Sequence, residues 1–141
     1  MIYEYFQKRD LNSLHVLTRK EPIPWIKENI EAHMMSPIGH IILFKEYGQI
    51  LGYMAHWILK NGDIQIKRFG VLESRRGEGI GRFMFNVYRH RLTKKQKLII
   101  HVPDSWLEVH KFLRHLGYRC NGIVDQRYRF ILWNVNNRIE V

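Results

Sequence analysis

The chain has 141 residues, of which 45% are hydrophobic and 13% aromatic, so its composition excludes a disordered protein and favours a single globular domain over residues 1–141. Cys120 is the only cysteine, which excludes an internal disulfide framework, and no apolar run approaches the roughly 20 residues of a membrane span. We therefore expect a cytoplasmic protein without membrane contact. The formal net charge of +10 attracts phosphates, acidic peptides or nucleic acids without selecting among them.

Capping residues, prolines and glycines divide the first part of the chain into short elements. Asp10 precedes a helical pattern and is expected to cap that helix. The segment EPIPW, residues 21–25, interrupts the chain before a second helical pattern, which ends at Pro37 and Gly39. The expected elements are a strand at 2–6, a helix from Asp10 to about Arg19 and a helix at 26–35.

Strand-forming residues dominate the middle of the chain. A turn around Gly48 and an Asn-Gly pair at residues 61–62 separate three apolar runs, and Asn-Gly between such runs is a strong hairpin signal. In the third run the apolar alternation changes phase near Lys67 and Arg68, which predicts a β-bulge that splays this strand from its neighbour. Three antiparallel strands are expected at 40–47, 50–59 and 63–71.

The remaining part of the chain alternates between helical and strand patterns. Ile80, Met84, Tyr88 and Leu92 recur at helical spacing, and Gly117 is placed to end a later amphipathic helix in the left-handed conformation. The expected elements are a helix at 80–92, a strand at 97–103, a helix at 107–116 and strands at 122–126 and 127–135. The whole order predicts an α+β domain with a mixed sheet of about seven strands and four helices.

The segment SRRGEGIGRFMF, residues 74–85, places three glycines between arginines at the start of the helix that begins at Ile80. Glycine in a helix costs about 1 kcal/mol relative to alanine, so bare backbone there needs a reason. Amides at a helix N-terminus converge on anions, and Arg75, Arg76 and Arg82 add positive charge. Arg82 excludes the Rossmann spacing, and no Gly-Lys-Ser/Thr follows to make a P-loop. The segment predicts a phosphate cradle.

The hexapeptide from Arg76 to Gly81 reads R-x-x-G-x-G and resembles the acyl-CoA pyrophosphate loop of the GNAT acetyltransferase superfamily. GVLESRRGEGIGRFMF resembles that family's motif from its central strand into its helix. EPIPW with the following helix is similar to the ribosomal-protein N-terminal acetyltransferase branch, and WLEVHKFLRHLGY resembles the second GNAT motif. The resemblance covers nearly the whole chain and implies a GNAT fold with a splayed acyl-CoA cleft.

The resemblance implies acetyl-CoA as co-substrate and no metal. In the family, backbone groups of the central strand pair with the pantetheine arm, and amides of the glycine loop hold the pyrophosphate. From the residues alone, Cys120, His110 and His115 lack a zinc-ligand spacing. The cofactor-binding residues that the resemblance implies are Phe69, Gly70, Val71, Arg76, Gly77, Glu78, Gly79, Ile80, Gly81 and Arg82.

The sequence departs from the family where protons are transferred. The usual tyrosine acid falls on Leu113, the usual asparagine on Trp106, and the glutamate base of the central strand on Gln65. The glutamate base of the N-terminal-alanine branch falls on His101, whose imidazole can accept a proton from an ammonium near neutral pH. His101 is therefore the candidate catalytic base. The substitute candidates are Tyr118, Tyr128 and Tyr88 as acids, with Tyr88 favoured as a core residue, and His110.

These features predict an acetyl-CoA-dependent N-acetyltransferase in which a primary amine attacks the thioester directly. The amine belongs to a protein or peptide N-terminus, a lysine or a small molecule, and the net charge favours an acidic peptide or protein. Two alternatives stay open: a catalytically weak or silent acyl-CoA-binding module, and a basic RNA- or ribosome-associated protein suggested by RHRLTKKQK, residues 89–97. That run lacks a nucleic-acid motif and interleaved aromatics, which favours a solvated helix end. A monomer or a homodimer is expected.

Overall fold

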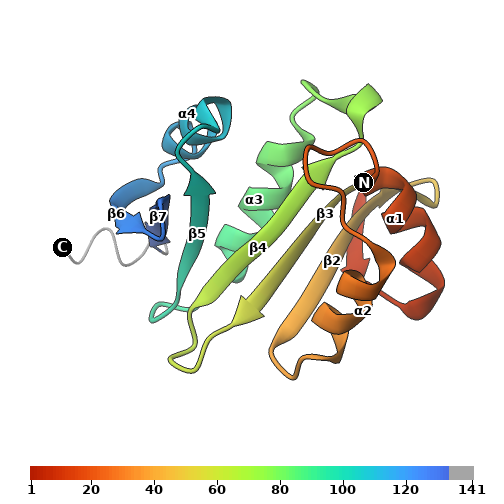
Figure 1. Cartoon of the computed structure of the whole chain (residues 1–141), viewed down its shortest axis with the longest axis horizontal. Helices are drawn as coiled ribbons and strands as arrows, with labels where there is room; N and C mark the ends of the chain where they lie inside the picture. The colour runs from red at the N-terminus through yellow and green to blue at the C-terminus, as the bar shows by residue number, and fades with distance from the viewer. Residues whose placement is uncertain (134–141) are drawn as a thin grey trace. The chain divides into compact units, whose positions relative to one another are not determined.

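The computed structural model in Figure 1 describes residues 1–133 and confirms the predicted order of elements. The strands hydrogen-bond in the order β1-β2-β3-β4-β5-β7-β6, with β4 and β5 parallel and the β1–β2, β2–β3, β5–β7 and β6–β7 pairs antiparallel. The sheet is therefore mixed, as predicted. The strands are β1 (Ile2–Tyr5), β2 (Gly39–Glu46), β3 (Gln49–Ile58), β4 (Ile64–Val71), β5 (Lys97–Pro103), β6 (Arg119–Val124) and β7 (Arg127–Trp133), and the helices are α1 (Leu11–Thr18), α2 (Lys27–Met35), α3 (Ile80–Arg91) and α4 (Leu107–His115).

The residues form two compact units. The N-terminal unit contains Met1–Trp57 and Arg68–Phe85, and the C-terminal unit contains Ile58–Lys67 and the chain from Asn86 onward. Both β4 and α3 contribute residues to each unit, so the units are joined through regular elements rather than through a linker. The single domain over residues 1–141 stays a prediction.

In the N-terminal unit, β2 is apolar at consecutive positions because both of its faces are covered. Ile41 is fully buried in a cluster with Leu14 of α1 and Ile30 of α2. The opposite face of β2 carries Phe44, whose ring packs edge-on against Phe83 of α3 with 6.1 Å between centroids. Figure 1 shows α1 and α2 in front of these strands. A strand buried on both faces loses the alternating pattern of a half-exposed one, which explains the run IILF.

An ion-paired lysine lies inside the N-terminal unit. The Nζ of Lys45 on β2 lies 2.6 Å from Oε1 of Glu4 on β1 and 3.0 Å from Oδ1 of Asp10. The hydrogen bond to Glu4 raises the pKa of Lys45, so the buried ammonium stays charged. Asp10 does precede α1, but the prediction that its side chain caps the helix is wrong. Its carboxylate instead accepts from Lys45 and from the backbone N–H of Gln7, because a buried ammonium is the stronger partner.

In the C-terminal unit, β5 alternates between a buried and a partly exposed face. Leu98, Ile100 and Val102 are buried, whereas Lys97, Ile99, His101 and Pro103 are half-buried. Among the α4 residues on the buried side, His110 packs its ring edge-on against Phe130 of β7, 5.1 Å between centroids. The face of β5 that carries His101 is therefore the one turned away from α4.

Two turns decide where the last elements begin and end. Gly117 has φ +99° and donates its N–H to the carbonyl of Arg114, while Tyr118 donates to the carbonyl of Leu113, which confirms the predicted end of α4. The strand expected at 122–126 is wrong at both ends. It begins at Arg119, and Asp125 and Gln126, with φ of 50° and 63°, form the turn into β7. Residues 134–135 of the last expected strand lie outside the described residues. Among residues 1–133, no helix combines the length and apolar character needed to cross a membrane.

Candidate functional site

The glycine loop leaves β4 and enters α3 with two residues in the left-handed backbone region. Gly77 has φ +83° and Gly79 has φ +85°, and a Cβ atom added to either would meet nothing within 4 Å. Glycine is therefore required there by backbone conformation, and the space beside both residues is open. Ile80 begins α3 and is buried, so the helix N-terminus is anchored in the unit. The first amides of a helix have no intrahelical acceptor and can bind an anion.

The arginines of the loop differ in what they contact. Arg75 donates through Nε to both carboxylate oxygens of Glu78, at 2.9 and 3.0 Å, and lies 3.5 Å from Glu46. Its charge is therefore balanced within the protein. Arg76 is exposed, donates through Nε to the carbonyl of Val71 at 3.2 Å, and lines a pocket of about 740 Å³ beside α1. With the exposed Arg82 of α3, it leaves two guanidinium groups accessible to an anionic ligand.

The end of β4 carries the other residues that the resemblance assigns to the cofactor. The ring of Phe69 packs edge-on against Phe85 at 5.0 Å, and Gly70 is buried. β4 and β5 pair in parallel along residues 64–66 and 98–100, all of them in the C-terminal unit. The bulge near Lys67 and the cleft between these strands stay predictions.

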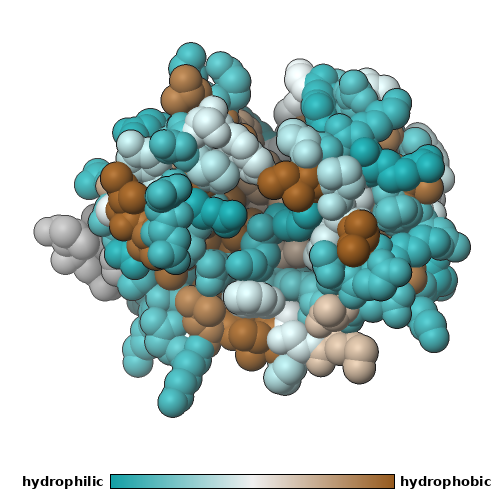
Figure 2. All heavy atoms as spheres, in the orientation of Figure 1, coloured by the Kyte–Doolittle hydropathy of each residue, from teal (hydrophilic) through white to brown (hydrophobic). Residues whose placement is uncertain are grey.

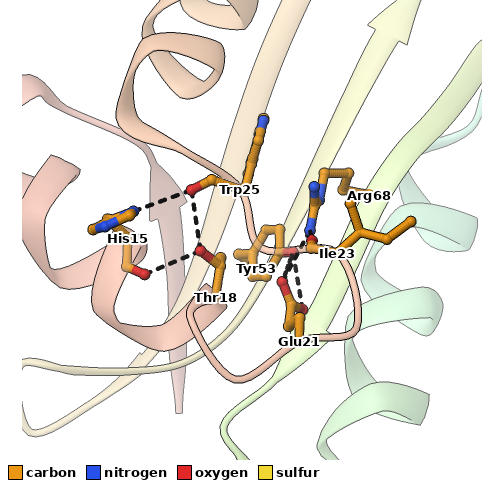
Figure 3. Close-up of polar contacts among 7 residues, drawn as sticks. All are labelled: His15, Thr18, Glu21, Ile23, Trp25, Tyr53 and Arg68. Atoms are coloured by element: carbon orange, nitrogen blue, oxygen red, sulfur yellow. Dashed lines mark hydrogen bonds and ion pairs between the residues drawn. The ribbon is translucent and has the colours of Figure 1, made fainter.

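A half-buried glutamate that sequence reasoning missed, Glu21, lies against Gly70. Figure 3 shows Glu21, from the segment between α1 and α2, pointing toward Tyr53 of β3 and Arg68 of β4. The Tyr53 hydroxyl donates to the Glu21 carboxylate at 2.7 and 3.1 Å, and Arg68 Nη2 donates to it at 3.2 Å. A Cβ atom on Gly70 would collide with Glu21 Oε2 and lie 2.8 Å from the Tyr53 ring. A glycine inside a strand indicates such a close approach, so Gly70 was the sequence signal that could have predicted this contact.

Aromatic contacts fasten the same segment to the sheet. The Trp25 ring stacks on the Tyr53 ring at 5.8 Å, and the Arg68 guanidinium lies over Trp25 at 5.2 Å while donating to the carbonyl of Ile23. Figure 3 also shows Thr18 donating its hydroxyl toward the Trp25 carbonyl, at 3.3 Å. Burial raises the pKa of Glu21, while hydrogen bonds from Tyr53 and Arg68 oppose the shift. Burial also raises the pKa of Tyr53, so its hydroxyl remains a donor.

Replacing Gly70 by alanine is expected to destabilise the protein by about 1–3 kcal/mol, the usual cost of an overpacked core. The Tyr53 ring is fully buried and Glu21 is held by two donors, so neither moves away freely. Urea unfolding of the wild type and the variant measures the difference. Glu21→Ala combined with Gly70→Ala removes one of the two collisions, so the double variant should lose less stability than the two single losses added together. Strict additivity would show that Glu21 does not collide with the new methyl group.

His101 lies in the C-terminal unit with one ring nitrogen in contact and the other enclosed. The side-chain amide nitrogen of Gln65 lies 3.3 Å from Nδ1. Nε2 is buried and has no hydrogen-bond partner among residues 1–133. Buried polar atoms are usually paired, and an exception marks a functional position or a missing partner. If the Gln65 amide presents its oxygen instead, Nδ1 carries the hydrogen and Nε2 becomes the proton acceptor.

The charges around His101 favour its neutral form. Burial lowers its pKa, and Arg129, Lys67 and Arg127 lower it further, while Asp125 raises it. At neutral pH the imidazole is therefore mostly deprotonated, which is the form that a general base requires.

Most of the substitute candidates for proton transfer are buried. His110 is buried and its Nε2 lies 2.8 Å from the carbonyl of Pro103, which fits a packing role. Tyr88 and Tyr118 are buried, and burial raises the pKa of Tyr118. Tyr128 is half-buried with its ring 5.0 Å from that of His110. Leu113, at the position of the family's tyrosine, is fully buried.

The fold and the glycine loop together define an α+β protein with a turn of positive-φ glycines between a central strand and a helix. The sequence model described as the acetyltransferase (GNAT) family matches residues 3–118. The chain therefore belongs to the GNAT family of acetyltransferases, which confirms the predicted family and enzyme class. Among curated protein sequences, none matches this chain significantly. Within residues 1–133, no three His, Cys, Asp or Glu side chains gather into a set that could hold a metal ion.

Solved structures show the same fold at low sequence identity. The ribosomal-protein-S18-alanine N-acetyltransferase from Escherichia coli has a TM-score of 0.78 and 11% identity over 92% of this chain and 90% of that chain. Arabidopsis thaliana NAA60 in complex with acetyl-CoA has a TM-score of 0.73 and 15% identity over 96% and 98%. A spermidine N-acetyltransferase SpeG chimera from Vibrio cholerae and hSSAT has a TM-score of 0.78 and 11% identity over 98% and 99%. These matches confirm the predicted GNAT fold.

Proposed function

We propose that the protein is an acetyl-CoA-dependent N-acetyltransferase that binds the cofactor pyrophosphate at residues 76–82. The observation that carries the proposal is the pair of positive-φ glycines beside open space at the start of α3, in a chain of the GNAT family. The amides of the loop and the exposed guanidinium groups of Arg76 and Arg82 would hold the phosphates. The backbone of residues 69–71 would pair with the pantetheine arm, as the resemblance implies.

The transfer itself needs one new bond and one proton acceptor. The amine nitrogen attacks the thioester carbonyl, the carbon–sulfur bond of the resulting tetrahedral intermediate breaks, and coenzyme A leaves as a thiolate. The amine proton passes to Nε2 of His101, which is buried and has no hydrogen-bond partner among residues 1–133, and it then returns to the thiolate or to solvent. Gln65, with its amide oxygen turned toward the ring, would accept a hydrogen bond from Nδ1 and so leave Nε2 free to take the proton.

The acceptor is proposed to be a primary amine on an acidic peptide or protein. By name, the three structural neighbours include enzymes for a ribosomal-protein alanine and for spermidine, so this fold serves both peptide and small-molecule amines. On the face shown in Figure 2, hydrophilic side chains dominate and hydrophobic ones form separate patches. Recognition through charge is therefore favoured, and the net charge of +10 favours anionic acceptors.

Two measurements test the proposal. Acetyl-CoA should raise the thermal midpoint of the protein, because a ligand that binds only the folded state stabilises it. A panel of peptide, lysine and small-molecule amines should then release free thiol from acetyl-CoA, with the protein-free mixture as control. A thermal shift without thiol release from any amine would favour the silent acyl-CoA-binding module. Absence of both responses would overturn the proposal.

A further inference from the structure

The C-terminal unit presents basic side chains on the same face of its strands as His101. Side chains alternate between faces along a strand, and directly paired residues share a face. Arg129 of β7 is the cross-strand partner of His101, and Arg127 is the partner of Pro103. Since His101 and Pro103 lie two residues apart on β5, all four side chains belong to one face of the sheet.

The neighbouring strand β4 adds a cation on the other side of His101. Ile66 pairs with Ile100, so the next residue of β4, Lys67, comes beside His101. The contact between Gln65 and His101 agrees with this assignment, because Gln65 and Lys67 lie two residues apart on the same face. Lys67 also lowers the pKa of His101 electrostatically, which places its charge nearby.

A fourth cation comes from β6, the edge strand. Arg119 pairs with Ile131, which lies two residues from Arg129 on β7, and Asn121 accepts a hydrogen bond from Arg129 at 2.8 Å. We call Lys67, Arg119, Arg127 and Arg129 the basic face.

The three arginines of the basic face lack the ion pairs that other basic residues form, although Asp125, in the turn after β6, adds one negative charge near His101. Lys45, Arg68, Arg75 and Lys97 each lie 3.5 Å or less from an aspartate or glutamate oxygen. Within the described part of the chain, by contrast, no carboxylate lies within 4.0 Å of the three arginines of the basic face. Burial and the repulsion of Arg127 lower the pKa of Lys67. Three arginines gathered without an ion-paired carboxylate favour binding of an external anion.

We propose that the basic face binds a carboxylate of the acceptor and that the acceptor is a peptide N-terminus with an acidic residue at its second or third position. The inference rests on the proposed function, because it assumes that the amine reaches His101. Neighbouring strands lie about 4.8 Å apart and residues advance about 3.3 Å along an extended chain. When the amine lies at His101, a carboxylate one or two residues further along the peptide is therefore at the right distance to contact the cations on the neighbouring strands.

The size of the basic face favours an acidic peptide over RNA. Arg127 and Arg129 are two residues apart, which corresponds to about 7 Å along β7, the strand that pairs with β5 beside His101. This area accommodates one or two carboxylates. Single-stranded nucleic acids instead use grooves that follow several phosphates, with aromatic side chains on which bases stack.

The test compares three peptides of equal length that begin with alanine followed by two aspartates, two asparagines or two lysines. We expect the wild type to have a kcat/KM about tenfold higher for the aspartate peptide than for the asparagine peptide at low salt, and a smaller ratio at high salt. Arg127→Gln and Arg129→Gln should each lower the aspartate value by about threefold and leave the asparagine value within about twofold. Lys111→Gln removes the same charge from the exposed surface of α4 and should change neither value.

Binding measurements separate this inference from the proposed function. Fluorescence anisotropy follows a labelled aspartate peptide and a labelled single-stranded oligoribonucleotide without any acetyl transfer. Equal kcat/KM values for the three peptides would overturn the acidic acceptor while leaving acetyl transfer intact. Tighter binding of the oligoribonucleotide that also depends on Arg127 would overturn it in favour of RNA. Peptide binding that needs Arg127, in a protein that acetylates nothing, would support the basic face and overturn the proposed function. Because the Arg129 side chain also donates to Asn121 of β6, the Arg127 variant is the one that removes no side-chain hydrogen bond to β6 within residues 1–133.

Discussion

Replacing His101 by glutamine is expected to lower kcat/KM for the amine by about 10²–10⁴-fold, the usual cost of losing a general base. Glutamine keeps a polar side chain beside Gln65 but cannot take up the proton of the attacking amine. Initial rates of thiol release from acetyl-CoA at low amine concentration give the value. The binding of acetyl-CoA should be nearly unchanged, because the cradle of residues 76–82 does not include His101.

His115→Gln is the matched control, since this histidine is exposed at the end of α4. It should leave kcat/KM close to that of the wild type. A His101→Gln enzyme within about threefold of the wild type would transfer the role of proton acceptor to water or to another residue.

The pH dependence should identify the same residue. The neutral imidazole is the base, so kcat/KM of the wild type should rise with pH until His101 is deprotonated. Burial and the cations Arg129, Lys67 and Arg127 lower the pKa of His101, and Asp125 alone opposes them, so the midpoint of the rise should lie below about pH 6.5, the value of an unperturbed histidine. Ionisation of the amine acts equally on both enzymes. The ratio of wild-type to His101→Gln rates therefore isolates this limb, and a ratio independent of pH would contradict the assignment.

Local patterns in the sequence predicted the elements and the glycine loop because their causes are local. The positive φ angles of Gly77 and Gly79 follow from a turn between a strand and a helix, and Gly117 ends α4 through hydrogen bonds to the preceding turn. The turn at Asp125 and Gln126 was not predicted, although its cause is also local. Their segment reads as a continuous strand, yet both residues adopt the left-handed conformation that a two-residue hairpin requires.

Contacts between residues distant in sequence could not be predicted in this way. Glu21 meets Tyr53 and Arg68, 32 and 47 residues further along the chain, and the sequence shows only an acidic residue before a proline. Asp10 was predicted as a helix cap from its position, but the ammonium of Lys45 lies 35 residues away and takes its carboxylate. The basic face could not be predicted for the same reason, because its cations come from three strands that only the strand register brings together. The net charge predicted an anionic partner, and the strand register shows which basic residues lie on one face of the sheet.

Replacing Gly79 by valine is expected to weaken acetyl-CoA binding by about tenfold to a hundredfold. Gly79 has φ +85°, a conformation that a β-branched residue adopts only with strain of about 1–3 kcal/mol. In the free protein the loop of the variant can relax to relieve this strain. Binding of acetyl-CoA must then restore the strained conformation, and each 1.4 kcal/mol of strain costs a factor of ten in affinity. The added side chain would also occupy the open space beside the amides. Isothermal titration of acetyl-CoA against both proteins measures the change.

Gly62→Val provides the matched control for the Gly79→Val measurement. Gly62 lies in the turn between β3 and β4 with φ +92°, and a Cβ there also meets nothing within 4 Å. The two substitutions therefore impose the same backbone strain in equally open surroundings, and only one lies in the cradle. Gly62→Val should reduce the stability of the protein and leave its affinity for acetyl-CoA unchanged. If both variants bind acetyl-CoA as tightly as the wild type, the loop of residues 76–82 does not hold the pyrophosphate; equal weakening in both would trace the loss to general destabilisation.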